Sequence, residues 1–180
     1  MYEAGEDSFL IGKYIKKFSK GKVLEIGCGS GYLMEIALSK TKNVKGVDID
    51  KESVEFCRKK GLDVSYSDLF SNVKGKFDVI IFNPPYLPQE EPFLKRNVRE
   101  RKNLDIIGGK RGYEVIERFF KDVKDFLKEK GEILILFSSL TNKEKVDSII
   151  KENNFKFELL EEKSVGLMEK LYVYRCYRKR

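Results

Sequence analysis

The chain has 180 residues, of which 41% are hydrophobic and 12% aromatic, so it can bury a core and global disorder is excluded. It contains no histidine, which excludes imidazole bases, histidine metal ligands and Ser-His or Cys-His pairs, and its three cysteines cannot form a four-cysteine zinc site. Lysine and arginine number 36 against 29 acidic residues, and the resulting charge of +7 fits a nucleic-acid partner or simply a solvated basic surface.

Length and targeting signals predict one cytoplasmic domain. The length fits a single domain over residues 1–180. No run approaches the roughly 20 apolar residues of a membrane span. The acidic start, Met1–Asp7, lacks the basic and apolar blocks of a signal peptide. We therefore expect a cytoplasmic protein without a membrane segment.

Hydrophobic periodicity predicts alternating helices and strands in the first half of the chain. In chain order, we expect a helix over Asp7–Phe18, a strand over Val23–Ile26, a glycine turn over Gly27–Gly31, a helix over Tyr32–Ser39, a strand over Val44–Ile49, a helix over Glu52–Lys60, and strands over Leu62–Tyr66 and Phe77–Phe82. The last of these strands is continuously apolar, which is typical of a strand covered on both faces.

The pattern is interrupted from Leu87 to Arg111. Within this stretch we expect Glu90–Arg111 to be a lid that is mobile without substrate and contacts the substrate when bound, and a solvated loop is the alternative. Alternating helices and strands predict an α/β fold with a doubly wound, mostly parallel sheet, and the C-terminal hairpin adds an antiparallel strand. The remaining expected elements are a helix over Gly112–Lys130, a strand over Glu132–Phe137, a helix over Lys143–Glu152, and strands over Phe155–Glu161 and Met168–Tyr177 around a turn near Ser164–Gly166.

A glycine-rich turn, Gly27–Gly31, follows the first predicted strand. Glycines there let the backbone approach a ligand and present helix N-terminal amides. A turn at the carboxyl end of a parallel strand predicts a nucleotide-like ligand. The carboxylate of Glu25 favours a cationic ligand over a pyrophosphate. A tight turn without a ligand is the alternative.

Acidic residues follow the next two predicted strands. Asp48 lies about 20 residues beyond the glycines, where a carboxylate typically accepts hydrogen bonds from ribose hydroxyls. Ser67-Asp68-Leu69 follows the third strand, where the edge of a base would lie. Taken alone, Asp48 could equally be a loop or N-cap residue. Together with the glycine turn, these residues predict a nucleoside site.

The fourth predicted strand ends in Asn83-Pro84-Pro85-Tyr86. The prolines fix an extended turn and leave the Pro84 carbonyl outside any strand ladder. This carbonyl and the Asn83 side-chain oxygen form two acceptors for a planar NH2 group, and Tyr86 supplies an aromatic face. A simple proline turn after a buried strand is the alternative.

These motifs resemble the class I S-adenosylmethionine-dependent methyltransferases that methylate planar amino nitrogens. The segments YEAGEDS (2–8), NPPYLP (83–88) and GGKRG (108–112) are similar, more specifically, to the HemK-like protein glutamine methyltransferases in their short archaeal and eukaryotic branch. The resemblance spans essentially the whole chain. It implies a Rossmann-like fold with a seven-stranded sheet and S-adenosylmethionine as cofactor. The implied reaction is methyl transfer to the glutamine amide nitrogen in the Gly-Gly-Gln motif of a translation release factor.

The resemblance also implies roles for individual residues. It implies no metal site. Departures occur at Ala4, where the family often has proline, and at Ile106, where this branch often has an aromatic residue. The implied cofactor contacts are Ser8, Glu25, Gly27, Gly29, Asp48, Asp68, Leu69 and Asn83, and the implied catalytic residues are Asn83, Pro84 and Tyr86.

A protein partner is implied as well. Archaeal and eukaryotic members work with a small zinc-binding activator protein that adds strands to one edge of the sheet. The third predicted strand, Leu62–Tyr66, lies at that edge, and we expect Val64 and Tyr66 to be exposed there. An open edge favours strand addition. The alternative is a monomer whose edge is protected by Asp63 and neighbouring lysines.

Three alternative functions stay open. The first is a methyltransferase acting on adenine N6, cytosine N4 or guanine N2 of RNA or DNA, which the charge of +7 supports. Against it, the chain has no room for a domain that flips and recognises a base. The second is a lysine-directed protein methyltransferase. The third is a non-enzymatic module that binds a release factor or the ribosome, against which Glu25, Asp48 and Asn83 argue.

Overall fold

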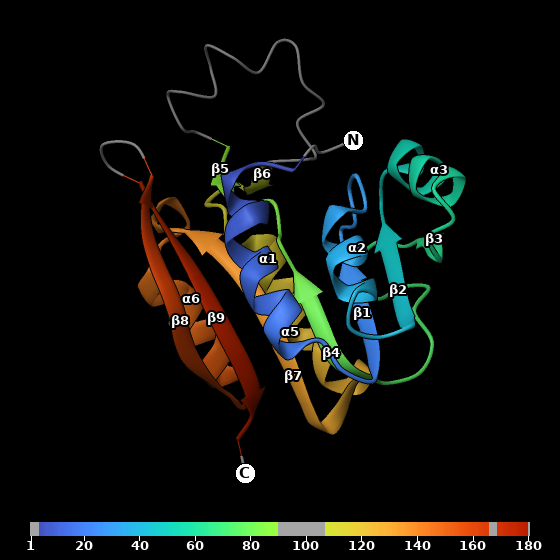
Figure 1. The fold of residues 1–180 in the computed structure, drawn as a ribbon. Coiled ribbons are helices and arrows are strands. Elements are labelled where there is room, and N and C mark those ends of the chain that lie inside the picture. Colours follow the sequence, from blue (N-terminus) through green and yellow to red (C-terminus); the bar gives the residue numbers. More distant parts are fainter. Residues whose placement is uncertain (1–3, 90–106, 166–168, 180) are drawn as a thin grey trace.

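The computed structural model describes residues 4–89, 107–165 and 169–179, so residues 90–106 of the expected lid, Ile106 among them, and Met168 lie outside the described residues. A seven-stranded sheet with the order β3-β2-β1-β4-β7-β9-β8 forms the centre (Figure 1). The pairs β1–β2, β2–β3, β1–β4 and β4–β7 are parallel, and β9 is antiparallel to β7 and β8, which confirms the predicted fold class. The strands are β1 (Lys22–Ile26), β2 (Asn43–Asp48), β3 (Val64–Tyr66), β4 (Phe77–Phe82), β7 (Leu127–Ser138), β8 (Phe155–Val165) and β9 (Glu169–Arg178).

The strand order reverses between β1 and β4. From β1 the chain adds β2 and β3 on one side, and it then returns to add β4 on the other side. In open α/β sheets, ligands bind at such a point, outside the carboxyl ends of the strands. The predicted glycine turn follows β1 and the Asn83-Pro84-Pro85-Tyr86 turn follows β4, so both motifs meet at this place.

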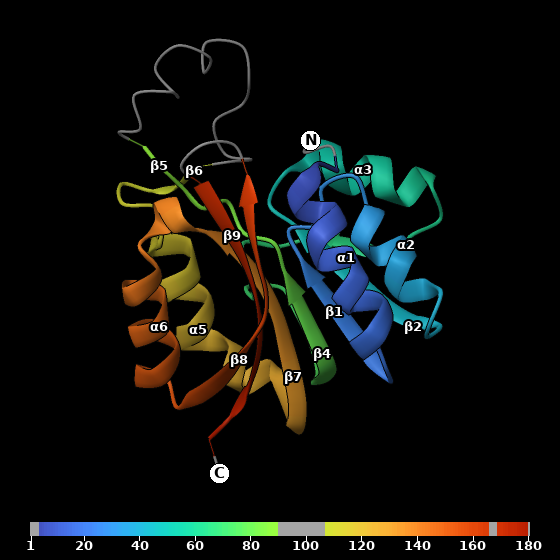
Figure 2. The same cartoon turned by 60° about the vertical axis from the view of Figure 1, so that its left-hand side comes forward.

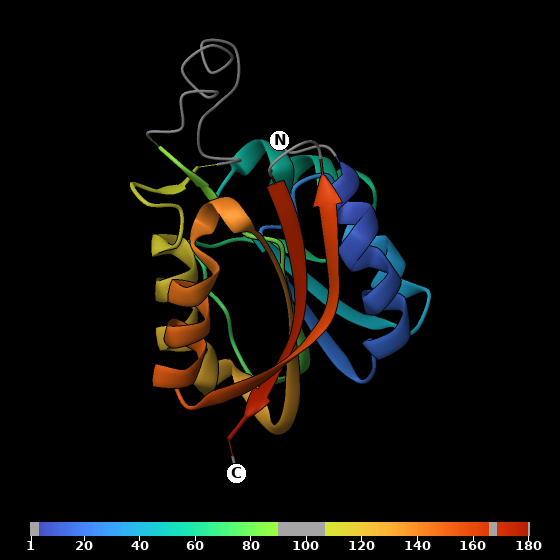
Figure 3. The same cartoon turned by 90° about the vertical axis from the view of Figure 1, so that its left-hand side faces the viewer.

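Helices cover both faces of the sheet, as Figures 2 and 3 show. One face carries α1 (Glu6–Phe18), α2 (Tyr32–Leu38) and α3 (Lys51–Lys59), and the other carries α5 (Glu114–Phe126) and α6 (Lys143–Glu152). None of these helices, which lie within the described ranges, has the length and apolar character needed to cross a membrane.

The core consists of two apolar layers, one on each face of the sheet. Along β4, Val79 and Ile81 pack toward α1 and α2, while Ile80 and Phe82 pack toward α5 and α6. All four side chains are at most 1% exposed. Because successive strand residues point to opposite faces, the uninterrupted apolar run of β4 fills both layers and holds its carboxyl end in place.

Two stretches between β4 and β7 differ from the sequence-based expectations. The expected helix to Lys130 ends at Phe126, and β7 begins at Leu127, whose buried side chain continues the apolar pattern while its backbone is extended and pairs with Phe77. The stretch expected to lack regular structure contains, at its two ends, the short strands β5 (Leu87–Pro88) and β6 (Ile107–Gly109), which pair with each other.

The edge strand β3 differs in one residue. Tyr66 is 43% exposed, as expected, but Val64 is only 3% exposed, so the expectation for Val64 was wrong. Val64 lies opposite Gly46 of β2, and a Cβ atom at Gly46 would be 2.5 Å from the sulfur of Met34 and 3.2 Å from Val64. Because Gly46 has no side chain, Val64 and Met34 fill the space beneath α2 and α3.

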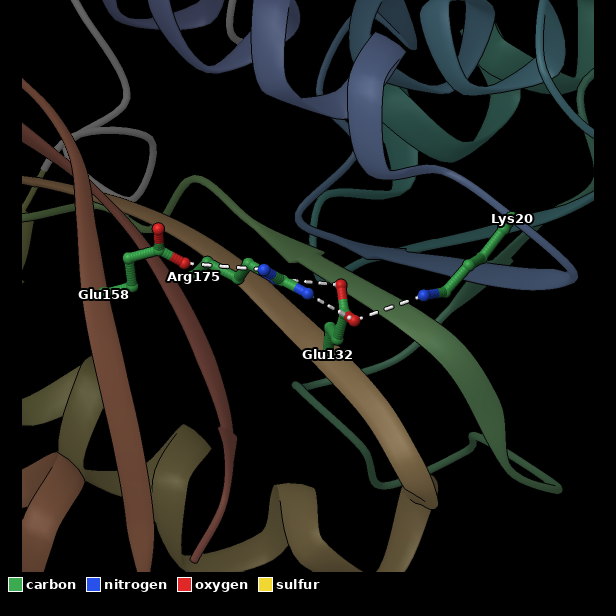
Figure 4. Close-up of polar contacts among 4 residues, drawn as sticks. All are labelled: Lys20, Glu132, Glu158 and Arg175. Carbon is green, nitrogen blue, oxygen red and sulfur yellow. Dashed lines mark hydrogen bonds and ion pairs between the residues drawn. The ribbon is translucent and has the colours of Figure 1, made fainter.

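Toward the amino ends of the parallel strands, away from the two motifs, the carboxylate of Glu132 links β7, β9 and the loop before β1 (Figure 4). Glu132 of β7 is 7% exposed and accepts hydrogen bonds from Nη2 and Nε of Arg175 on β9, at 2.7 and 3.0 Å. Lys20, before β1, donates at 3.2 Å, and Arg175 also reaches Glu158 of β8 at 3.4 Å. Burial disfavours the charge of Glu132, but the hydrogen bonds from Arg175 and Lys20 outweigh it and hold the pKa of this carboxyl below its ordinary value.

We predict that Glu132→Gln lowers the free energy of unfolding at pH 7 by about 1.5–3 kcal/mol, the usual contribution of hydrogen bonds to a charged group. A carboxyl whose pKa is lower in the folded state stabilises the fold above its unfolded pKa, roughly 4.3, and this stabilisation is lost as the pH falls through the folded pKa. Denaturant unfolding should therefore show a difference between wild type and variant that shrinks toward about pH 3.

The exposed Glu129, which forms no ion pair with any residue that the structure describes, provides the control Glu129→Gln. Equal unfolding free energies for the two variants at pH 7 would show that the Glu132 contacts contribute nothing.

Candidate functional site

A cleft lies at the carboxyl ends of β1, β2 and β4, where the strand order reverses. The structure brings all the sequence-predicted site residues to this cleft, although their roles stay predictions. No cluster of three or more metal-ligating side chains is found within the described ranges. The predicted residues that line the cleft are Ser8, Glu25, Gly27, Gly29, Asp48, Asp68, Leu69, Asn83, Pro84 and Tyr86.

The glycine turn forms the floor of the cleft beside β1. The backbone N–H groups of Gly27 and Cys28 both donate to the carbonyl of Val47 on β2, at 2.8 and 3.2 Å. Gly27 has a φ of +72°, and a Cβ atom there would meet nothing within 4 Å. This residue therefore adopts a backbone conformation that favours glycine and leaves open the space that a side chain would occupy.

Two carboxylates flank the turn. Asp48, at the end of β2, accepts hydrogen bonds from the backbone N–H groups of Gly29 and Asp50, both at 2.8 Å. Glu25, near the end of β1, is 2% exposed, and its Oε2 atom has no hydrogen-bond partner within the part of the chain that the structure describes. Burial, and secondly the charge of Asp48, raise the pKa of the Glu25 carboxyl well above its ordinary value.

Such a pair fits a ligand that brings hydrogen-bond donors or a positive charge. A buried carboxylate oxygen without a donor is costly, and a cationic group would lower that cost and favour the ionised form of Glu25. The carboxylate of Asp48 is already oriented by two backbone N–H groups, and each of its oxygens can accept a further bond. The two carboxylates therefore fit a nucleoside that carries a positive charge.

The Asn83 side chain is oriented by Asp7, a residue that sequence reasoning missed. Asn83 Nδ2 donates to Asp7 Oδ2 at 2.9 Å, and the other oxygen of Asp7 accepts the backbone N–H of Ser8 at 2.7 Å. Asp7 is 6% exposed, and Oδ1 of Asn83 is buried without a partner among the described residues. The amide thus keeps its acceptor available, next to the Pro84 residue that lines the same cleft.

Asp7 resembles an ordinary helix-start residue in the sequence, because acidic residues are common in the first turn of a helix. The one signal that could have found it was its place beside Ser8, inside the motif YEAGEDS.

The side of the cleft near β3 contains Arg118 and Ile49, which were not predicted, beside the predicted Asp68 and Leu69. Asp68 forms an ion pair with Arg118 of α5 at 2.8 Å, which orients the carboxylate across the cleft. Leu69 is 8% exposed and has a φ of +46°, which is uncommon for a residue other than glycine. Ile49, directly after Asp48, is 46% exposed and adds an apolar surface. Periodicity alone could not distinguish Arg118 from other charged residues of its helix.

The two halves of the cleft differ chemically. One half has carboxylates and an apolar surface, which suits a nucleoside with a positive charge. The other half is lined by Asn83, Pro84 and Tyr86, and Oδ1 of Asn83 is its buried acceptor. Among the described residues that line the cleft, the basic side chain is Arg118, which pairs with Asp68 in the first half. The arrangement can hold an NH2 group next to a bound cation.

Comparisons with known proteins agree with this chemistry. The family model for the methyltransferase small domain matches residues 6–100. The "Putative protein N5-glutamine methyltransferase" of Methanocaldococcus jannaschii is 38% identical over 186 residues, which cover 99% of this chain and 92% of that protein. The release factor glutamine methyltransferase of Borreliella burgdorferi is 32% identical over 124 residues, which cover 63% of this chain and 43% of that protein.

A ribosomal RNA methyltransferase shows a shorter match. The ribosomal RNA small subunit methyltransferase C of Haemophilus influenzae is 41% identical over 76 residues, which cover 37% of this chain and 23% of that protein. This similarity therefore concerns only part of the chain.

Solved structures have the same fold. The Mtq2–Trm112 complex of E. cuniculi, described as responsible for methylation of the eRF1 translation termination factor, matches with a TM-score of 0.78 and 24% identity, over 99% of this chain and 98% of that chain. A methyltransferase from Bacteroides fragilis in complex with S-adenosyl-L-homocysteine matches with a TM-score of 0.67 and 18% identity, over 94% of this chain and 77% of that chain. These similarities confirm the Rossmann-like fold of S-adenosylmethionine-dependent methyltransferases.

The family is established by the model that matches residues 6–100 and by the relative that is 38% identical along 99% of the chain. The chain belongs to the methyltransferase small-domain family and, within it, to the HemK-like protein glutamine methyltransferases.

Proposed function

We propose that this protein binds S-adenosylmethionine and methylates the side-chain amide nitrogen of the glutamine in the Gly-Gly-Gln motif of a translation release factor. The observation that carries the proposal is the buried Oδ1 atom of Asn83 at the end of β4, which has no partner in residues 4–89, 107–165 and 169–179 and belongs to an amide oriented by Asp7. The named activities of the relatives from Methanocaldococcus and Borreliella support the same substrate class. Release factors act on ribosomes, so the proposal locates the reaction in the cytoplasm.

The cofactor would occupy the carboxylate-lined half of the cleft. Asp48 would accept hydrogen bonds from the ribose hydroxyls, and the orphan oxygen of Glu25 suits the cationic methionine moiety, near Ser8. Asp68 and Leu69 would contact the base. When bound, S-adenosylmethionine supplies an activated methyl group on a sulfonium.

The protein's own contribution is to hold and orient the amide. An amide nitrogen is a weak nucleophile, because its lone pair is delocalised into the carbonyl. If Asn83 Oδ1 and the Pro84 carbonyl each accept one N–H of the substrate, the lone pair is left facing the methyl donor. Positioning of this kind can be worth roughly 7–11 kcal/mol. No strong base is required, because the methylated nitrogen is cationic and can lose its proton to water, in agreement with a chain without histidine.

Base methylation of RNA is the competing function. Exocyclic amino groups of bases present the same NH2 geometry, and a ribosomal RNA methyltransferase matches part of the chain. That match covers only 37% of the chain, whereas the glutamine methyltransferase relative covers 99%. A protein substrate is therefore the better supported function.

We predict that Glu25→Gln and Asp48→Asn each weaken S-adenosylmethionine binding by about 1.5–3 kcal/mol, the cost of losing a hydrogen bond to a charged group. Because protonated Glu25 binds a cation less well, wild-type affinity should fall as the pH decreases through the raised pKa of Glu25, and Glu25→Gln should lose this dependence. Titration calorimetry over a series of pH values above the ordinary pKa of a glutamate measures both effects.

The control is Glu55→Gln on the exposed side of α3. If both cleft variants bind as tightly as this control, the assignment of the two carboxylates to the cofactor is wrong.

We predict that Asn83→Ala lowers methyl transfer by about 100- to 1000-fold, because one preorganised polar partner is lost. Cofactor affinity should change little. The assay supplies labelled S-adenosylmethionine with a release factor, its Gly-Gly-Gln to Gly-Gly-Glu variant, or bulk tRNA and rRNA, and the labelled residue is mapped by mass spectrometry. Label on RNA, on lysine or on the variant factor would contradict the proposed substrate, and near-normal turnover of Asn83→Ala would contradict the mechanism.

We further propose that a small activator protein, zinc-binding in the family that the motifs resemble, adds a strand to β3. The similarity to the Mtq2–Trm112 complex supports a partner of this kind. In β3, the Asp63 carbonyl accepts from Gly46 on β2, so the carbonyls of Val64 and Tyr66 face the outer edge. Arg58 Nε and Asn72 Nδ2 donate to them, at 2.8 and 3.1 Å. A partner strand would replace these two side-chain donors with its own N–H groups.

We predict that Tyr66→Glu reduces co-purification with the activator, because a charge would replace an apolar contact next to the new strand. Leu159→Glu is the control, because Leu159 is 46% exposed on β8 at the other edge of the sheet. Size-exclusion chromatography of co-expressed pairs measures complex formation. Equal complex formation by both variants, or full activity and solubility of the chain alone, would contradict the proposal.

A further inference from the structure

The Asn83-Pro84-Pro85-Tyr86 turn is held by few strand hydrogen bonds of its own. Two of its four residues are prolines, which have no N–H to donate. Beyond the turn, β5 pairs with β6, and the Gln89 N–H donates to the Gly109 carbonyl at 3.0 Å. This pairing brings the segment around Gly108 against the turn, above the carboxyl end of β4 (Figure 1).

Two glycines contact the turn backbone to backbone. A Cβ atom at Gly108 would lie 2.5 Å from the carbonyl oxygen of Pro85, and it would also collide with the carbonyl of Gly112. A Cβ atom at Gly112 would lie 2.6 Å from the carbonyl oxygen of Tyr86, and Gly112 has a φ of +89°. Because both obstacles are backbone atoms, no side-chain rotation can relieve the contacts. Any larger residue must displace the turn or the segment that carries it.

A third residue fixes the turn from another element. Thr141, in the 3-10 helix η2 (Ser139–Thr141) after β7, is fully buried and donates its hydroxyl to the Tyr86 carbonyl at 2.9 Å. The Tyr86 carbonyl is therefore in contact with Gly112 on one side and with Thr141 on another. At the other end of the turn, Asp7 holds the Asn83 amide.

We infer that Gly108, Gly112 and Thr141 are positioning residues for the methyl-transfer reaction, and we call them the turn clamp. They fix the carbonyls of Pro85 and Tyr86, and through the stiff Pro-Pro segment they set where the Pro84 carbonyl and Asn83 stand relative to the bound cofactor. The inference rests on the proposed function and goes beyond it, because these three residues need not touch substrate or cofactor. A displacement of about 1 Å at a reacting centre can lower a rate by roughly 100-fold.

The test of the glycines uses a control that carries the positive-φ cost of Gly112, a cost that Gly108 does not have. Gly61 has a φ of +81°, is exposed, and a Cβ atom there would meet nothing within 4 Å. Gly61→Ala therefore carries the strain of a positive φ without a clash. We expect Gly108→Ala and Gly112→Ala to lower kcat by about 100-fold, with the affinity for S-adenosylmethionine unchanged, and we expect Gly61→Ala to leave both quantities as in wild type.

The test of Thr141 does not depend on the glycine variants being able to fold. Thr141→Val keeps the shape but removes the hydroxyl, and we expect it to lower kcat by about 10-fold at unchanged cofactor affinity. Thr141→Ser restores the hydroxyl and should recover most of the rate. A role in packing alone predicts the opposite order, because serine leaves a cavity and valine does not.

The outcomes separate the turn clamp from the proposed function. If Asn83→Ala is inactive while the clamp variants turn over at the rate of Gly61→Ala, the turn clamp is refuted and the proposed function stands. A Thr141→Val enzyme that is faster than Thr141→Ser also refutes it. If wild-type protein does not methylate the release factor, the proposed function itself fails. Loss of kcat in the clamp variants with intact cofactor binding supports the inference.

Discussion

The site depends on a buried acceptor, the Oδ1 atom of Asn83, for which the described residues supply no donor. Leaving such an atom unpaired costs about 1–3 kcal/mol, so the surrounding structure must hold it there against relaxation. The strand β4 does so from below, because its apolar side chains are packed on both faces. Asp7 does so from the side, because it takes both the Asn83 amide and the Ser8 N–H. A substrate NH2 group would remove this cost, so the fold favours binding of that group.

Charge is distributed in a way that suits the same chemistry. The chain as a whole carries +7, yet Glu25, Asp48 and Asp68 bring negative charge to one half of the cleft. Burial, and secondly the charge of Asp48, raise the pKa of the Glu25 carboxyl and so disfavour its ionised form. A cationic ligand reverses this balance. Under the proposed function, preference for the cationic cofactor would come from unfavourable electrostatics between protein groups.

The sequence predicted best the features that depend on one element at a time. The apolar run before Asn83 and the glycine turn after Ile26 specify buried strands and a close approach by themselves, so the sheet and the cleft could be predicted. Features that depend on two distant segments could not. Leu127 has the periodicity of the preceding helix, and only its pairing with Phe77 makes it the start of a strand. Val64 is buried because Gly46, on another strand, lacks a side chain.

Asp7 and Arg118 belong to the same class, because each acquires a role only through a partner 76 or 50 positions away, Asn83 and Asp68 respectively. The two ends of the sheet illustrate what such long-range contacts achieve. At the amino end of β7, the acceptors of Glu132 are filled by Arg175 and Lys20, and the charge there is fully compensated. At the carboxyl ends of β1 and β4, one oxygen each of Glu25 and Asn83 has no donor in the part of the chain that the structure describes. The paired charges of Glu132, Arg175 and Lys20 thus stabilise the fold away from the cleft. The acceptors in the cleft can therefore stay available for the cofactor and the substrate amide.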